Sequence, residues 1–203
     1  MSITIVDYGV GNLASVARAL TFVGASPRRV TDPGAVGDST AIVIPGVGHF
    51  SSTRALNALW RKPIIAAVDN GVPILGICLG MQWLFDGSAE DPDVPGLGLM
   101  PGVCERLTGS VKIPHVGWNT LERGSRASVL LEGIGAGAAS YFTHSYAAPA
   151  TADATATTTH AQTFASVVER GRVFGVQWHP EKSGGVGLAL LSNFSAFARS
   201  VSC

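Results

Sequence analysis

The chain has 203 residues, of which 46% are hydrophobic and 14% are charged. This length and composition suit one compact domain with a sizeable core. Fourteen basic residues balance fourteen acidic residues, so no net charge favours nucleic acid or an anionic membrane as a partner. The three cysteines, Cys78, Cys104 and Cys203, form no C-x-x-C pair, which argues against a disulfide framework and against a zinc site.

We expect neither a targeting segment nor a membrane span from the sequence. A strand-like run follows Met1 at once, without a charged n-region or a long apolar h-region. No window reaches the roughly 18 uninterrupted apolar residues that a membrane helix needs. We therefore expect a cytoplasmic protein in a reducing environment, with no cofactor, no metal, no nucleic acid and no membrane among its partners.

Short apolar runs alternate with helical patterns over the first half of the sequence. Strands are predicted at 3–8, 27–30, 41–44 and in the run before Cys78, and helices at 13–22, 64–70 and 79–85. Asn12 is the predicted N-cap of the first helix, and Gly71 lies where a helix C-terminal glycine is expected. Alternation of this kind predicts a largely parallel sheet covered by helices on both faces.

The second half has weaker patterns. Residues 91–102 should form a loop, 112–119 a functional loop without regular structure, and 147–159 an exposed connection. Strands are predicted at 140–146, 165–168 and 172–178, the last two as an antiparallel pair, and a final helix at 186–198. No linker or repeat suggests a second domain. The prediction is therefore one α/β domain over residues 1–203, with a mostly parallel central sheet and an antiparallel extension.

Cys78 lies in the most informative segment of the chain. An apolar run leads into it, Gly76 and Gly80 flank it at two residues' distance, and a helix-favouring segment follows. This pattern is typical of a strand–turn–helix elbow that presents a nucleophile, with sulfur in place of a serine oxygen. The N-terminus of the following helix favours a thiolate. Because a free cysteine is often simply buried, the assignment depends on a matching base elsewhere.

Among the five histidines, His179 is best placed to take the proton from the thiol. It ends a strand and precedes a proline, which keeps its backbone extended. Residues two apart in an extended segment project to the same side, so Glu181 can reach the imidazole nitrogen that does not face sulfur. Cys78, His179 and Glu181 are thus predicted as nucleophile, base and orienting residue. We expect His144 to be a core or rim residue and His160 to be solvated.

Attack on a carboxamide or ester leaves negative charge on oxygen, which must meet hydrogen-bond donors already in place. In an elbow, the N–H of the residue after the nucleophile is one donor, here Leu79. The loop that follows the neighbouring strand should supply the second donor, from Val47 or Gly48. Because the glycines of this loop permit a peptide flip that would remove the donor, we hypothesise that the loop is a control point.

Several motifs together give the chain a resemblance to a known family. Residues 76–82, with residues 178–181, resemble the class I (triad) glutamine amidotransferases. Residues 7–12 (DYGVGN), 45–50 (PGVGHF) and 114–119 (PHVGWN) narrow the resemblance to the glutaminase subunits of imidazole glycerol phosphate synthases. These motifs cover both ends and the middle of the chain.

The resemblance implies a flavodoxin-like amidotransferase fold and the hydrolysis of L-glutamine to glutamate and ammonia through a Cys78 thioester. The ammonia would pass to a cyclase subunit, a (β/α)8 barrel in a heterodimer, for the synthesis of imidazole glycerol phosphate and an aminoimidazole carboxamide ribotide in histidine biosynthesis. The positions that match the family's glutamine-binding residues are Gly46, Gln82, Ser145 and Tyr146. The positions implied to face the cyclase and its ammonia entrance are Asn12, His115, Trp118, Asn119 and Lys182.

Other functions remain open at the level of the sequence. The chain could be the glutaminase of another synthase, such as that of anthranilate or pyridoxal phosphate, although the motifs at 7–12 and 114–119 argue against this. A catalytically silent module that regulates a barrel partner is disfavoured by the intact Cys78, His179 and Glu181. A cysteine peptidase is disfavoured because the sequence shows no signal for an extended peptide groove.

Overall fold

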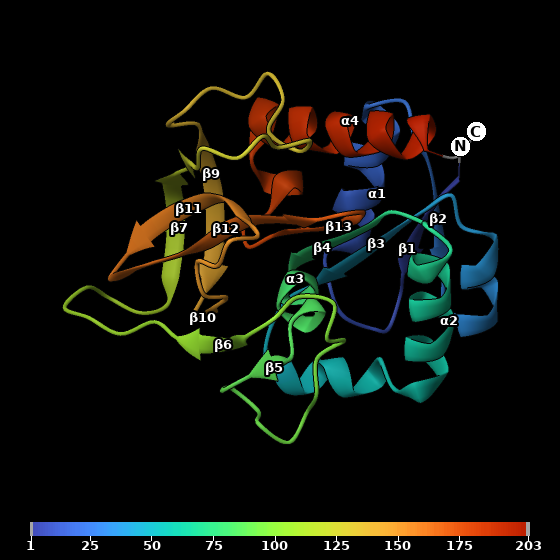
Figure 1. Cartoon of the computed structure of the whole chain (residues 1–203), viewed down its shortest axis with the longest axis horizontal. Helices are drawn as coiled ribbons and strands as arrows, with labels where there is room; N and C mark the ends of the chain where they lie inside the picture. Colours follow the sequence, from blue (N-terminus) through green and yellow to red (C-terminus); the bar gives the residue numbers. More distant parts are fainter. Residues whose placement is uncertain (1, 202–203) are drawn as a thin grey trace.

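An eight-stranded sheet lies at the centre of the computed structural model, which describes residues 2–201 (Figure 1). Cys203 lies outside the described residues. In order across the sheet the strands are β2 (Ser26–Val30), β1 (Ser2–Val6), β3 (Ala41–Gly46), β4 (Ile74–Cys78), β13 (Val173–Val176), β12 (Gln162–Arg170), β11 (Ala154–His160) and β8 (Glu122–Arg123). The first five are parallel and the rest join antiparallel. The predicted mixed sheet is confirmed.

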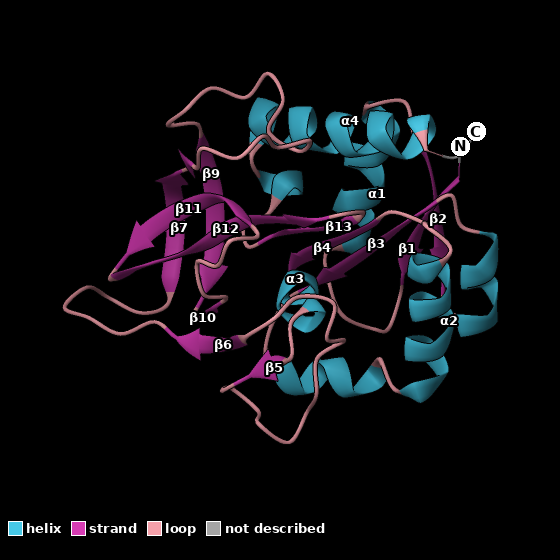
Figure 2. Ribbon diagram, viewed as in Figure 1, coloured by secondary structure: helices cyan, strands magenta, loops and turns pink. Residues whose placement is uncertain are grey.

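Helices cover both faces of this sheet, as Figure 2 shows. One face carries α1 (Leu13–Phe22) and α4 (Gly184–Ser200), and the other carries α2 (Ala58–Asp69) and α3 (Leu79–Leu84). The connections contain the short 3-10 helices η1 (Pro33–Asp38), η2 (Phe50–Ala55) and η3 (Pro180–Lys182). Within residues 2–201, no helix has the length and apolar character needed to cross a membrane.

Two smaller sheets extend the domain beyond β12 and β11. A two-stranded antiparallel sheet pairs β7 (His115–Thr120) with β9 (Ala139–His144). A further small sheet joins β10 (Tyr146–Ala147), β6 (Val103–Arg106) and β5 (Gly87–Ser88). In Figure 1, β7 and β9 lie at the left, far from β1 and β2, whereas the second small sheet runs from β10 and β6 at the left to β5 below α3.

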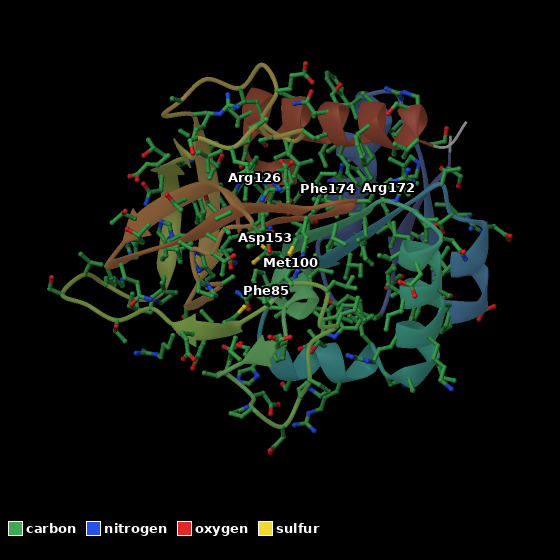
Figure 3. The ribbon with its side chains drawn as sticks, viewed as in Figure 1. Phe85, Met100, Arg126, Asp153, Arg172 and Phe174 are labelled. Carbon is green, nitrogen blue, oxygen red and sulfur yellow. The ribbon has the colours of Figure 1, made fainter. Side chains whose placement is uncertain are left out.

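The two faces of the central sheet bury separate apolar clusters. On the side of α4, Phe174 packs edge-to-face against Phe194 and Phe197. On the side of α3, Phe85 and Met100 belong to the second cluster, and Figure 3 shows these side chains on opposite sides of the sheet. Strands β3 and β4 are buried along their whole length. Such burial explains why the first-half strands appear in the sequence as continuous apolar runs.

Helix boundaries agree with the sequence in one case and differ in another. Helix α1 has the predicted bounds, but Asn12 caps it through its backbone carbonyl and makes no side-chain capping bond. Helix α2 begins well before residue 64, because the side chain of Asn57 accepts a hydrogen bond from Leu59 N–H and caps the first turn. Pro63 lies inside this helix.

Two predictions for the second half were wrong. Residues 112–114 are irregular as predicted, but residues 115–119 are not, because they lie in β7, which pairs residue by residue with β9. Residues 147–159 are not an exposed connection, because they contain most of β11, with Thr155, Ala156 and Thr158 buried in the central sheet. In both segments, pairing with a distant strand outweighs a weak local pattern.

We predict that Gly187→Ala destabilises the protein, because a Cβ at Gly187 in α4 would collide with the backbone carbonyl of Pro180. The expected loss in the free energy of unfolding is about 1–3 kcal/mol, as for other overpacked sites, measured by urea unfolding. Gly185→Ala is the matched control in the same helix, since a Cβ there meets open space. Equal effects of the two substitutions would contradict the steric explanation.

Candidate active site

Cys78 lies at the carboxyl end of β4 and immediately before α3. Its backbone has φ 53° and ψ −109°, a left-handed conformation that is unusual for a residue with a Cβ. The residue is 4% exposed. Strained backbone of this kind is found at nucleophile elbows and other functional sites.

The glycines around Cys78 are required by close packing. A Cβ on Gly76 would collide with the backbone of Gly80, and a Cβ on Gly80 would collide with the carbonyl of Ile44 at the end of β3. A Cβ on Gly46 would meet the hydroxyl of Tyr8 and the side chain of Leu79. The sequence pattern around the cysteine therefore has a steric cause.

His179 is held beside the elbow by backbone and side-chain contacts. Strand β13, which it follows, pairs in parallel with β4, and its backbone N–H donates to the carbonyl of Tyr141 on β9 at 2.9 Å. Nδ1 of His179 lies 2.9 Å from Oε1 of Glu181, and both side chains are 1% exposed. Nε2 is buried and makes no close hydrogen bond with the described residues. The imidazole is thus oriented from one side and available from the other.

The environment raises the pKa of His179 to about 10. Burial opposes the charge on the imidazole, but the hydrogen bond to Glu181 and the nearby polar groups of Cys78 and Glu181 outweigh burial. The raised pKa of His179 favours an imidazolium beside the sulfur of Cys78. That pairing is the one that makes a cysteine nucleophilic.

The Cys78 thiol has two further neighbours. Sγ donates to the carbonyl of Thr143 on β9 at 3.8 Å, and Nε2 of Gln177 donates to Sγ at 3.7 Å. Gln82, one turn along α3 from the cysteine, donates from Nε2 to the carbonyl of Tyr146 at 2.7 Å and to Oε1 of Gln177 at 3.1 Å. The nucleophile is therefore embedded in a network of amide groups.

A pocket of about 640 Å³ opens next to these groups. Its lining contains five predicted site residues: Asn12, Val47, Gly48, Ser145 and Lys182. The remaining lining residues are Gly11, Glu90, Pro114, Thr143 and His144. Cys78, His179 and Glu181 are not in this lining, and neither are Leu79, Gly46, Gln82 and Tyr146. The pocket adjoins the nucleophile through Thr143, whose carbonyl accepts from Sγ of Cys78. The structure thus brings the predicted oxyanion loop, part of the predicted glutamine site and two predicted partner-facing residues around one cavity.

The other predicted partner-facing residues lie on β7. Trp118 is 60% exposed, whereas His115 is buried and Asn119 is half-buried. The Trp118 ring packs edge-on against Tyr141, and the ammonium of Lys182 lies 5.6 Å from the centre of the same tyrosine ring. Exposure of so large an apolar side chain argues against a role in core packing.

The structure agrees with the expectation for His144 and differs from the expectation for His160. His144 is buried, as expected of a core or rim residue. His160 is not simply solvated, because its ring stacks on His115 with centroids 4.1 Å apart and its Nε2 lies 2.9 Å from the Lys112 carbonyl. The expectation failed because β11, which carries His160, was itself not predicted.

Glu90 is a pocket residue that the sequence did not reveal. Its Oε2 accepts a hydrogen bond from the backbone N–H of Phe50 at 2.7 Å, and it supplies the one carboxylate among the lining residues. It lies in the turn after β5, where no motif marks it. The feature of the sequence that could have indicated Glu90 as a pocket residue is its position shortly after the elbow.

Comparisons with known proteins agree with the fold and the site. The sequence profile described as "Glutamine amidotransferase class-I" matches residues 4–196. The chain belongs to the class I glutamine amidotransferase family.

Within this family the chain is similar to proteins named imidazole glycerol phosphate synthase subunit HisH. It is 43% identical to that of Moorella thermoacetica, over 97% of this chain and 95% of the relative. It is 46% identical to that of Halobacterium salinarum, over 95% of this chain and 92% of the relative.

Solved structures show the same fold at low sequence identity. A structure described as a glutamine amidotransferase superimposes with a TM-score of 0.72 at 16% identity, covering 98% of both chains. The structure of PurLQS from Thermotoga maritima gives a TM-score of 0.75 at 20% identity, covering 97% of this chain and 98% of the other.

We predict that the contribution of His179 to stability decreases as pH rises. Its pKa is 6.5 without the folded environment and about 10 within it. A raised pKa means that the stabilisation is complete below pH 6.5 and is lost as pH rises through about 10. The difference in unfolding free energy between the native chain and His179→Gln should therefore shrink across this window, as measured by urea unfolding at several pH values. A difference that stays constant would contradict the assignment.

Proposed function

We propose that this chain is the glutaminase subunit of an imidazole glycerol phosphate synthase. It hydrolyses L-glutamine and passes ammonia to a cyclase subunit, a (β/α)8 barrel, within a cytoplasmic heterodimer. The observation that carries the proposal is the buried Cys78, His179 and Glu181 beside a pocket. The similarity to HisH subunits over nearly the whole chain supports it. We also propose that residues 1–203 form a single amidotransferase domain.

The proposed reaction has two steps, both carried by side chains of the chain itself and without a cofactor. The Cys78 thiolate attacks the carboxamide carbon, a C–S bond forms, and the C–N bond breaks as His179 gives its proton to the departing ammonia. Water then attacks the thioester carbon and gives a proton to His179, a C–O bond forms, and the C–S bond breaks. This step releases glutamate and restores the Cys78 thiolate and the protonated imidazole. Glu181 orients the imidazole through Nδ1 and stabilises its charge.

The negative charge on oxygen in each step needs donors close to the elbow. We assign one to the N–H of Leu79, at the start of α3, and the second to the loop of Val47 and Gly48 in the pocket wall. Gly48 has φ +91°, a conformation that glycine adopts easily. Loss of one such donor raises the barrier by about 2.7–4 kcal/mol, so the orientation of this loop's peptides is proposed to control the rate.

Substrate binding is proposed to use the charge inside the pocket. Glutamine carries an ammonium group, and Glu90 supplies a carboxylate in the pocket lining. Ser145 forms part of the same wall, while Gln82 and Tyr146 lie behind it and support the site. Gly46 acts by allowing close approach of backbone to Leu79.

The proposed cyclase interface lies where β7 meets the mouth of the pocket. Val116 and Trp118 are 57% and 60% exposed on this strand, and exposed apolar groups of this size favour a protein contact. Asn12 and Lys182 belong to the pocket lining, so a partner on this face would cover the exit for ammonia. His115 and Asn119 would support the face from beneath.

Cys78→Ala tests the reaction and the partner together. In the complex with a candidate cyclase subunit, the substitution should abolish glutamate release from glutamine because no thioester can form. Synthesis of imidazole glycerol phosphate from added ammonia should continue at the native rate, which controls for correct assembly. Glutamine hydrolysis by the variant at the native rate would disprove the nucleophile assignment. Product formation only with an anthranilate or pyridoxal phosphate partner would favour the other amidotransferase subunits.

Glu90→Gln tests the proposed recognition of the substrate ammonium. The amide keeps an acceptor for the Phe50 N–H but removes the charge, so KM for glutamine should rise about tenfold, equivalent to a charged hydrogen bond of ~1.4 kcal/mol, with little change in kcat. Asp91→Asn is the matched control, because Asp91 pairs with the exposed Arg54. An unchanged KM in Glu90→Gln would refute this role.

A further inference from the structure

Two buried histidines outside the proposed catalytic set connect β7 with the surroundings of Cys78. His115 on β7 and His144 on β9 lie opposite each other in the strand register. Nδ1 of His115 lies 3.0 Å from Nε2 of His144, and the residues are 3% and 7% exposed. A buried polar pair of this kind needs an explanation, because the reaction described above uses neither ring.

The hydrogen-bond partners determine where each proton lies. Nδ1 of His144 is 3.0 Å from the carbonyl of Tyr146, which can only accept, so Nδ1 carries the proton. Nε2 of neutral His144 therefore accepts from Nδ1–H of His115, and Nε2 of His115 accepts from the side-chain amide of Asn119 at 3.2 Å. The Asn119 amide is oriented independently, since its nitrogen also donates to a β11 carbonyl and its oxygen accepts the next backbone N–H.

The hydrogen-bonded path that runs from Asn119 through His115 to His144 continues to the nucleophile. The Tyr146 carbonyl accepts from both His144 and Gln82, at 3.0 and 2.7 Å, so both of its lone pairs are engaged. Gln82 also donates to Gln177, whose Nε2 donates to Sγ of Cys78. The orientation of the amides around sulfur is thus tied to the ring of His144.

Protonation would interrupt this path, and the environment opposes it. Burial lowers the pKa of His144 to about 3 and that of His115 to about 4. The neighbouring titratable groups also oppose protonation. A charge on His160, which stacks on His115, disfavours a charge on both rings, and a charge on His179 disfavours a charge on His144. Both rings therefore stay neutral near pH 7.

We propose that His115 and His144 are positioning residues that fix the Tyr146 carbonyl and, through it, the Gln82 and Gln177 amides beside Cys78. Neither ring is a catalytic residue. The proposal rests on the proposed glutaminase function for its kinetic consequences, whereas its consequences for proton positions and thiol reactivity do not depend on the substrate.

Nitrogen-15 NMR of the full-length chain tests the proton positions directly. The path requires the Nδ1–H tautomer in both His115 and His144, which is the less populated form of free histidine in water. We expect both rings to keep this tautomer, uncharged, from about pH 6 to about pH 8. An Nε2–H tautomer in either ring, or protonation of either ring in this range, would overturn the proposal.

Two substitutions of His144 separate its two hydrogen bonds. Asparagine places an amide N–H near the position of Nδ1 and keeps the bond to Tyr146, whereas glutamine reaches the position of Nε2 and loses that bond. His144→Gln should slow alkylation of Cys78 by iodoacetamide about three- to tenfold, as expected for loss of one neutral hydrogen bond. It should raise KM for glutamine by about three- to tenfold as well, and it should lower kcat by less. His144→Asn should recover most of both losses.

His160→Ala is the control, because it removes the ring that stacks on His115 and breaks no bond of the path. It should leave alkylation and KM at native values. Equal losses in the two His144 variants, or native alkylation in a folded His144→Gln, would refute the positioning role. If His144→Gln does not fold, the tautomers of the native chain decide. Absence of glutamine hydrolysis by the native complex would disprove the proposed function, while the tautomer and alkylation results would still decide the positioning role.

Discussion

The contact between the first turn of α3 and the end of β3 is the constraint on which the site depends. Gly80 lies so close to the carbonyl of Ile44 that a residue with a Cβ would not fit. This approach draws the helix N-terminus over the strand ends, where Cys78 takes a left-handed conformation, and it sets the Gly46–Val47–Gly48 loop beside the nucleophile. One steric requirement thus positions both the sulfur and the loop proposed to stabilise negative charge.

Strands from the second half of the chain place the remaining parts of the site around Cys78. Parallel pairing of β13 with β4 brings His179 to the same edge of the sheet as Cys78. Strand β9 then contributes through its backbone, since Tyr141 accepts the His179 N–H and Thr143 accepts the thiol proton. The antiparallel extension is therefore part of the site, and the amidotransferase family's parallel core alone would leave His179 without this support.

The sequence was informative where the chemistry is local and uninformative where pairing is distant. The elbow around Cys78 could be predicted because its glycines are spaced by the turn itself, and the His179–Glu181 contact follows from an extended segment before a proline. Strands β7 and β11 could not be predicted, because their order comes from partners far along the chain. Glu90 was missed for the same reason: its pocket position depends on how the turn after β5 folds back toward Phe50.

The dependence of His179 on β9 has a consequence for how the protein loses its structure. Strands β7 and β9 form a separate two-stranded sheet, and isolated pairs of this kind open more easily than a large central sheet. Opening of this pair would release the His179 backbone and the Thr143 carbonyl while the parallel core stays folded. A local fluctuation would then disrupt the site. The integrity of the site is therefore determined by the local stability of the β7–β9 pair and not by the stability of the whole domain.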